Sequence, residues 1–185
     1  MRDIDSIVVH CAATPPSMDI GATIIRDWHV HERGWSDIGY HYVIRRNGEI
    51  EKGRPVKRPG AHAKGFNHNS IGVCWVGGVA EGSSAPEDNR TAEQSASLFA
   101  LLQELQTQFP GAAVLGHRDI KGVTKACPSF DVRQWYTQAC IDRKENQREG
   151  LANETEVQNT TSKSSSWIIS ILSCLRRCIL QRSEG

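Results

Sequence analysis

The sequence predicts a fold of the α/β or α+β class: a single domain over residues 1–140, with a mixed central β-sheet flanked by helices. Three observations favour this class. β-Branched apolar runs alternate along the chain with segments of helical periodicity, and a strong hairpin signal lies among them. Apolar residues make up 38% of the chain and charged residues 23%, which leaves enough apolar material for a packed core.

The amino-terminal segment is expected to supply the first strand and the first helix. Residues 4–12 are mostly apolar and β-branched, which is typical of a buried strand, and His10 lies near the end of this run. Apolar side chains then recur at helical spacing between Asp19 and Arg33, which predicts an amphipathic helix. Gly34 ends the pattern, because glycine often follows the last turn of a helix.

The middle of the domain carries the hairpin signal. Residues 41–46 and 49–52 flank Asn47-Gly48, a dipeptide that tight two-residue β-turns favour, so these segments should pair as antiparallel strands. Residues 71–76 are again apolar and are followed by two glycines, which indicates a further buried strand.

The last part of the domain should contain two helices and a short strand. A helix is expected over residues 91–108, because Thr91 and Gln94 have the spacing of a capping box ahead of a leucine-rich periodic segment. Residues 113–116 indicate a short strand, and residues 131–140 a final short helix.

Composition also limits the partners and the compartment. The formal net charge of +1 gives no electrostatic reason to expect a nucleic acid as a partner. The six cysteines follow no regular spacing, so reduced thiols in a cytosolic setting are expected. The amino terminus, MRDIDSIVVH, has neither a long apolar segment nor a small-residue cleavage site, so no signal peptide is expected.

The carboxy-terminal part of the chain differs in composition. Residues 141–166 are polar, as in a flexible linker. Residues 167–185 begin with WIISILSCLRRCIL, whose apolar side chains gather on one side of a helical wheel, so an amphipathic helix is expected. This run is shorter than the ~20 apolar residues of a membrane span and contains two arginines. Contact with a membrane surface is one alternative, self-association or docking on the first domain is a second, and disorder of this segment is a third.

Three residues that can bind a metal ion stand at predicted strand ends or in loops: His10, His117 and Cys127. Two imidazoles and a thiolate suit zinc, and a set of three ligands leaves a fourth position for water, as in hydrolytic zinc sites. Their spacing matches no compact zinc motif. Taken alone, each histidine is as well explained as a surface or hydrogen-bonded residue, and the cysteine as part of the core.

Five segments, in this order, resemble the zinc-dependent N-acetylmuramoyl-L-alanine amidases of type 2: IVVHCAAT at 7–14, GWSDIGYHYVI at 34–44, HAKGFNHNSIGVC at 62–74, LGHRD at 115–119 and KACPSFD at 125–131. The resemblance covers residues 4–140 and is strongest to the phage amidase endolysins, also called phage lysozymes. It implies the fold that this family shares with peptidoglycan recognition proteins.

The resemblance also implies an active site. His10, His117 and Cys127 would bind zinc, which would activate a water molecule for attack on the amide between N-acetylmuramic acid and L-alanine. Tyr40 would donate to the oxyanion or relay a proton, and Lys125 would stabilise the oxyanion. Without the resemblance, Tyr40 would be read as an aromatic residue at a sheet edge and Lys125 as a solvated loop lysine.

The loop over residues 62–70 is expected to receive the substrate. In the family, its first histidine lies close to the metal and its asparagines line the groove for the muramyl peptide. The resemblance therefore implies that His62, Asn67 and Asn69 bind substrate. The alternative is a polar turn that asparagine side chains hold together.

The implied function is that of a phage endolysin, which cleaves bacterial peptidoglycan during host lysis. Such a protein is expected in the host cytoplasm and would need a separate membrane-permeabilising protein to reach the wall. One alternative is a non-catalytic peptidoglycan-binding module, which the presence of Cys127 disfavours. Another is a dual-role regulator that also binds and inhibits a phage RNA polymerase. Only nine residues precede His10, so much of the amino-terminal extension that this role partly uses in the family is expected to be missing, which disfavours this alternative.

Overall fold

A computed structural model describes residues 2–150 of the chain. The chain divides into two compact units, Met1–Gln138 and Ala139–Gly185. The predicted helix over residues 167–185 and the linker beyond residue 150 lie outside the described residues. Among the described residues, no helix combines the length and the apolar character that a membrane span requires.

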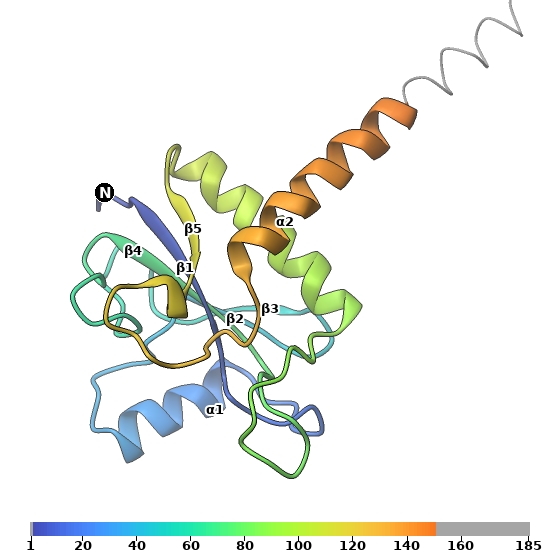
Figure 1. Cartoon of the computed structure of the whole chain (residues 1–185). Coiled ribbons are helices and arrows are strands. Elements are labelled where there is room, and N and C mark those ends of the chain that lie inside the picture. Colours follow the sequence, from blue (N-terminus) through green and yellow to red (C-terminus); the bar gives the residue numbers. More distant parts are fainter. Residues whose placement is uncertain (1, 151–185) are drawn as a thin grey trace, which may run out of the picture. The chain divides into compact units, whose positions relative to one another are not determined.

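The first unit is built on a five-stranded mixed sheet in the order β3-β2-β4-β1-β5 (Figure 1). β1 (Ser6–Cys11) lies between β4 (Ser70–Trp75) and β5 (Ala113–Gly116) and is parallel to both. β2 (Tyr42–Ile44) is parallel to β4 and antiparallel to β3 (Ile50–Lys52). The predicted fold class, with its mixed sheet and its hairpin, is confirmed.

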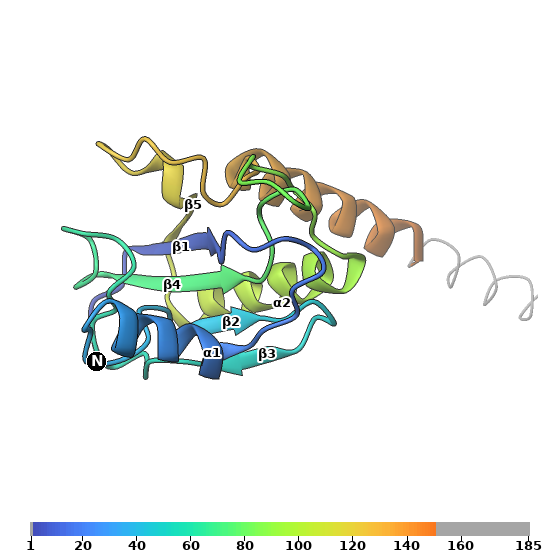
Figure 2. The same ribbon diagram turned by 90° about the horizontal axis from the view of Figure 1, so that it is seen from below.

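Two helices cover opposite faces of this sheet (Figure 2). α1 (Ala22–Asp27) continues into a π-helical turn, η1 (Trp28–Glu32), so the predicted first helix is present but changes its winding. α2 (Ala92–Gln108) begins with the predicted capping box, in which the Thr91 hydroxyl accepts from the Gln94 backbone N–H and the Gln94 side chain accepts from the Thr91 N–H.

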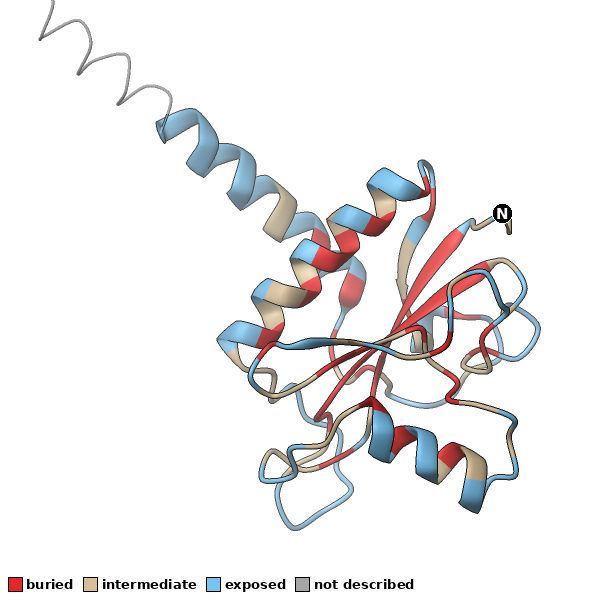
Figure 3. Ribbon diagram, turned by 180° about the vertical axis from the view of Figure 1, so that it is seen from behind, coloured by how far each residue is buried: buried red, intermediate tan, exposed pale blue. Residues whose placement is uncertain are grey.

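Burial follows from this three-layer arrangement. β1 and β4 are buried along their whole length, because helices cover both faces of these central strands (Figure 3). On one face, Ala22 and Ile25 of α1 pack with Val43 and Cys74 of the sheet. On the other face, α2 buries one stripe of leucine side chains, which are Leu98, Leu101, Leu102 and Leu105. The carboxyl ends of β1 and β5, where the candidate site lies, therefore belong to a sheet that is packed on both faces.

The structure differs from the sequence expectation at the carboxy-terminal end of the first unit. Residues 132–138 are helical, as predicted, but in the second unit residues 139–150 are helical too, where a flexible linker was expected from residue 141. Every side chain over residues 141–150 is exposed. A polar composition is typical of a flexible linker, yet Glu, Gln, Lys and Arg are also strong helix formers and need no buried face.

Candidate active site

His10 and His117 meet because they follow parallel neighbouring strands. His10 is the fifth residue of β1 and pairs in register with Cys74, so both side chains point to the face of the sheet that carries α1. His117 comes directly after β5 and opens a short 3-10 helix, η2 (His117–Asp119). Since β5 is parallel to β1, the two histidines lie at the same edge, and their ring centroids are 4.5 Å apart.

Cys127 reaches this edge from a loop that is bonded to both histidine segments. The backbone N–H of Arg118 donates to the carbonyl oxygen of Cys127 at 2.8 Å. The backbone N–H of Cys11 donates to Sγ of Cys127 at 3.4 Å. The Sγ atom lies 3.8 Å from Nδ1 of His10. One ligand atom from each of His10, His117 and Cys127 lies within 4.8 Å of the other two.

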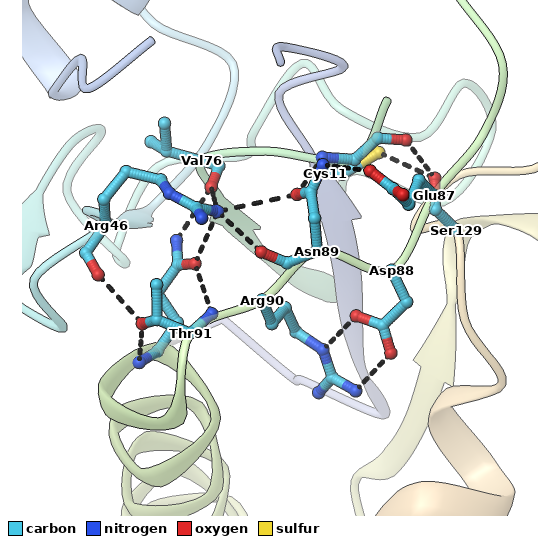
Figure 4. A network of polar contacts seen from close by, with 11 residues as sticks. Cys11, Arg46, Val76, Glu87, Asp88, Asn89, Arg90, Thr91 and Ser129 are labelled. Carbon is cyan, nitrogen blue, oxygen red and sulfur yellow. Dashed lines mark hydrogen bonds and ion pairs between the residues drawn. The ribbon is translucent and has the colours of Figure 1, made fainter. Parts of the chain in front are cut away.

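Ser129, in the same loop as Cys127, bonds this loop to the backbone just after β4 (Figure 4). The Ser129 hydroxyl donates to the carbonyl oxygen of Gly78 at 2.7 Å, and the N–H of Glu87 donates to the same oxygen at 3.0 Å. Asn89 accepts from the Gly78 N–H through its side-chain oxygen. These bonds hold the Cys127 loop against the core, so the sulfur has a fixed position opposite His10.

Burial keeps the two imidazoles neutral. The burial of His10, and then the neighbouring His62 and His117, hold the pKa of His10 well below its ordinary value. Burial, and then the charge of Lys125, lower the pKa of His117. Because only a neutral imidazole has a free lone pair, both residues are in the form that binds a metal at neutral pH.

An open cleft of about 630 Å³ gives access to these three residues, and both predicted catalytic side chains line it. Tyr40 precedes β2, and its ring centroid lies 5.1 Å from that of His10. Burial raises the pKa of Tyr40 well above its ordinary value, so the phenol keeps its proton and can donate it. Lys125 is exposed at the cleft, two residues before Cys127.

The three predicted substrate-binding residues do not share one environment. His62 and Asn67 line the cleft, whereas Asn69 does not. The side-chain amide of Asn69 donates to the carboxylate of Asp5, outside the cleft. The side-chain oxygen of Asn67 accepts from the backbone N–H groups of His62 and Ala63, both at 2.9 Å. Asn67 thus holds the turn at His62, as expected for a polar turn that asparagine side chains hold together.

Two further histidines near the cleft serve the backbone. Nδ1 of His29 accepts from the Gly39 N–H at 3.0 Å, and Nδ1 of His41 accepts from the Gly72 N–H at 2.9 Å. Burial lowers the pKa of each of these two histidines to about 4. Protonation would remove the acceptor and place a charge among buried groups, so both contacts depend on a neutral ring.

We therefore expect the metal-free protein to lose stability as the pH falls from 7 to 4.5. The unfolded chain takes up protons at the ordinary histidine pKa of about 6.5, well before the folded chain does. The stabilising difference is fully present above that pH and is lost down to about pH 4, by up to about 1.4 kcal/mol per pH unit for each histidine. Denaturant unfolding at several pH values measures this slope.

His29→Asn is the matched control for this prediction. Asparagine keeps an acceptor for the Gly39 N–H but does not titrate, so the pH-dependent loss should be smaller than in the unmodified protein. An unfolding midpoint that stays constant between pH 7 and 5 in the unmodified protein would contradict the assignment of buried neutral rings.

Comparisons with known proteins show the family of this chain. The family described as N-acetylmuramoyl-L-alanine amidase matches residues 1–130. The endolysin of Escherichia phage T7 is 47% identical over 132 residues, which are 71% of this chain and 85% of the relative. The solved structure of the amidase LysC from Clostridium intestinale aligns with a TM-score of 0.62 at 28% identity, over 76% of this chain and 87% of that one.

The same architecture occurs in a recognition protein. Drosophila PGRP-LB aligns with a TM-score of 0.59 at 24% identity, over 69% of this chain and 76% of that chain, which shows a shared fold. Fold and site together define a peptidoglycan amidase of the endolysin type. The chain belongs to the N-acetylmuramoyl-L-alanine amidase family. The resemblance, the enzyme class and the peptidoglycan substrate predicted from the sequence are thus confirmed.

Proposed function

We propose that this amidase is a zinc enzyme and acts as a phage endolysin. It would hydrolyse the amide between the lactyl group of N-acetylmuramic acid and the L-alanine of the stem peptide, and so weaken the host wall during lysis. One observation carries this proposal. The donor atoms of His10, His117 and Cys127 lie within 4.8 Å of one another, in a cleft that Tyr40 and Lys125 also line.

The donor set fits zinc. Two neutral imidazoles and one thiolate match the borderline-soft character of Zn²⁺. Of the three residues, His10 is buried and the other two are partly exposed toward the cleft. Three protein ligands leave a fourth position for water or substrate, which is the pattern of catalytic rather than structural zinc sites. When bound, zinc would polarise the scissile carbonyl and lower the pKa of a water molecule toward neutrality.

Tyr40 and Lys125 have separate roles in this proposal. The Lys125 ammonium would stabilise the negative charge that develops on the carbonyl oxygen during attack. Because Lys125 is exposed at the cleft, its side chain has room to approach that oxygen. The Tyr40 phenol stays protonated at neutral pH and would donate a hydrogen bond or a proton to the reacting amide. Asn67 would shape the groove by holding the turn at His62.

The chemistry of the products tests the function. Purified peptidoglycan digested with the zinc-loaded full chain should yield new amino-terminal L-alanine in step with the loss of turbidity, and no new reducing sugar ends. Reducing ends would indicate a glycosidase instead. Retention on the wall without any released peptide would support the alternative of a non-catalytic binding module.

Other predicted partners stay predictions. Contact with a phage RNA polymerase is tested by pull-down of the purified enzyme with the full chain. Contact with a membrane surface, or self-association, was predicted for residues 167–185, which lie outside the described residues. Sedimentation with anionic liposomes, compared between the full chain and a chain ending at Gly150, distinguishes the two.

A further inference from the structure

His62 lines the cleft, yet its ring is directed at the proposed metal ligand His10. Nδ1 of His62 lies 3.1 Å from Nε2 of His10, and the two rings meet edge to face with an interplanar angle of 81°. The other ring nitrogen of His10, Nδ1, faces Sγ of Cys127 at 3.8 Å. Each nitrogen of His10 therefore has its own neighbour, and Nδ1 is the atom on the side of the ligand cluster.

The different neighbours of Nδ1 and Nε2 of His10 determine the direction of the hydrogen bonds from His10 to His62 and from His62 to Ser70. If Nδ1 of a neutral His10 binds the metal, the proton must be on Nε2, which then donates to Nδ1 of His62. The proton of a neutral His62 is then on Nε2, which lies 3.4 Å from the Ser70 hydroxyl oxygen. The Ser70 hydroxyl itself donates to the carbonyl oxygen of Phe66 at 2.6 Å, so its oxygen is free to accept. Donors and acceptors match along the whole chain of contacts.

The surroundings of His62 are shaped to its ring. A Cβ atom at Gly72 would come within 2.5 Å of the ring, and one at Gly60 would also overlap it. Glycine at both positions therefore leaves the space in which the ring lies. The two backbone bonds to the Asn67 side chain fix the turn from which the ring projects. A side chain that only lined an open groove would need none of these constraints.

We propose that His62 is a positioning residue for the metal: its Nδ1 accepts the Nε2 proton of His10 and so holds His10 in the tautomer and orientation that present Nδ1 as a ligand. This inference rests on the proposed zinc site. It replaces the substrate-binding role that the resemblance implied for His62. Partners of this kind raise the basicity of the ligand, and their loss weakens metal affinity by about 10- to 100-fold.

Two variants of nearly equal shape test the acceptor itself. His62→Asn places a carbonyl oxygen close to the position of Nδ1, whereas His62→Leu has the same outline and no acceptor. Zinc affinity of each full-length variant is measured by competition with a chromophoric chelator, and the unfolding temperature of each zinc-free variant is measured alongside. We expect His62→Leu to bind zinc about 10- to 100-fold more weakly and His62→Asn to stay within about threefold of the unmodified protein.

The outcomes separate this inference from the zinc proposal. Equal losses of affinity in both variants would mean that the ring acts through packing, and unchanged affinity in His62→Leu would mean that it does not act on the ligand; either result overturns the inference. An unmodified protein that binds no zinc would instead refute the metal site. Similar unfolding temperatures of the two zinc-free variants show that a difference in affinity does not come from a difference in folding.

Discussion

Replacing Cys127 with serine should remove most of the bound zinc, because a neutral hydroxyl is a much weaker zinc ligand than a thiolate. The amidase activity should fall by about a hundredfold or more, since metal activation of water contributes several kcal/mol. The sulfur is 3.8 Å from Nδ1 of His10 and holds its place through the Cys11 N–H, so the change is confined to the ligand atom. Elemental analysis of the purified variant gives the zinc content, and peptide release from purified wall gives the activity.

Cys140→Ser is the control for this substitution, because Cys140 does not line the cleft. It should keep both zinc and activity. Full zinc occupancy in Cys127→Ser would take the cysteine out of the ligand set and leave the two histidines to be explained in another way.

The second large effect concerns Lys125 and Tyr40. Lys125→Ala and Tyr40→Phe should each lower kcat by roughly a hundredfold, the scale of one lost oxyanion or proton-transfer group. Neither residue is a proposed ligand, so zinc content and thermal stability should stay close to those of the unmodified protein. Steady-state rates on soluble muramyl peptides, with elemental analysis of the same samples, measure both properties.

A nearby lysine provides the comparison for charge alone. Lys121 is exposed and does not line the cleft, so Lys121→Ala should turn over substrate at the unmodified rate. Unchanged turnover in Lys125→Ala or in Tyr40→Phe would show that the residue concerned has no part in the reaction.

Most of the fold could be predicted because its signals are local. The capping box at Thr91, the hairpin at Asn47-Gly48 and the apolar runs of β1 and β4 each depend on a few neighbouring residues. The π-helical turn after α1 could not be predicted, since apolar spacing does not distinguish it from an α-helix. The helical residues 141–150 were expected to be a linker because exposed helix formers and linkers share a polar composition.

The candidate site could likewise be predicted only where its residues depend on local signals. The positions of His10 and His117 follow from two strands, and parallel strands that end at one edge bring them together. The directions of side chains in the loop at 60–70 depend on contacts far along the chain. Asn69 contacts Asp5 and His62 contacts His10, although the same substrate-binding role was expected for both residues. A local pattern contains no information on such distant partners.

Stepwise return of zinc to the metal-free full chain tests the central claim most directly. The zinc is first removed with a chelator, and amino-terminal L-alanine released from purified peptidoglycan is then measured after each addition. The proposed site predicts almost no release without metal and a linear rise that ends at about one zinc per chain. Full release by the metal-free protein, or a rise that ends at a clearly different ratio, would contradict a zinc amidase built on His10, His117 and Cys127.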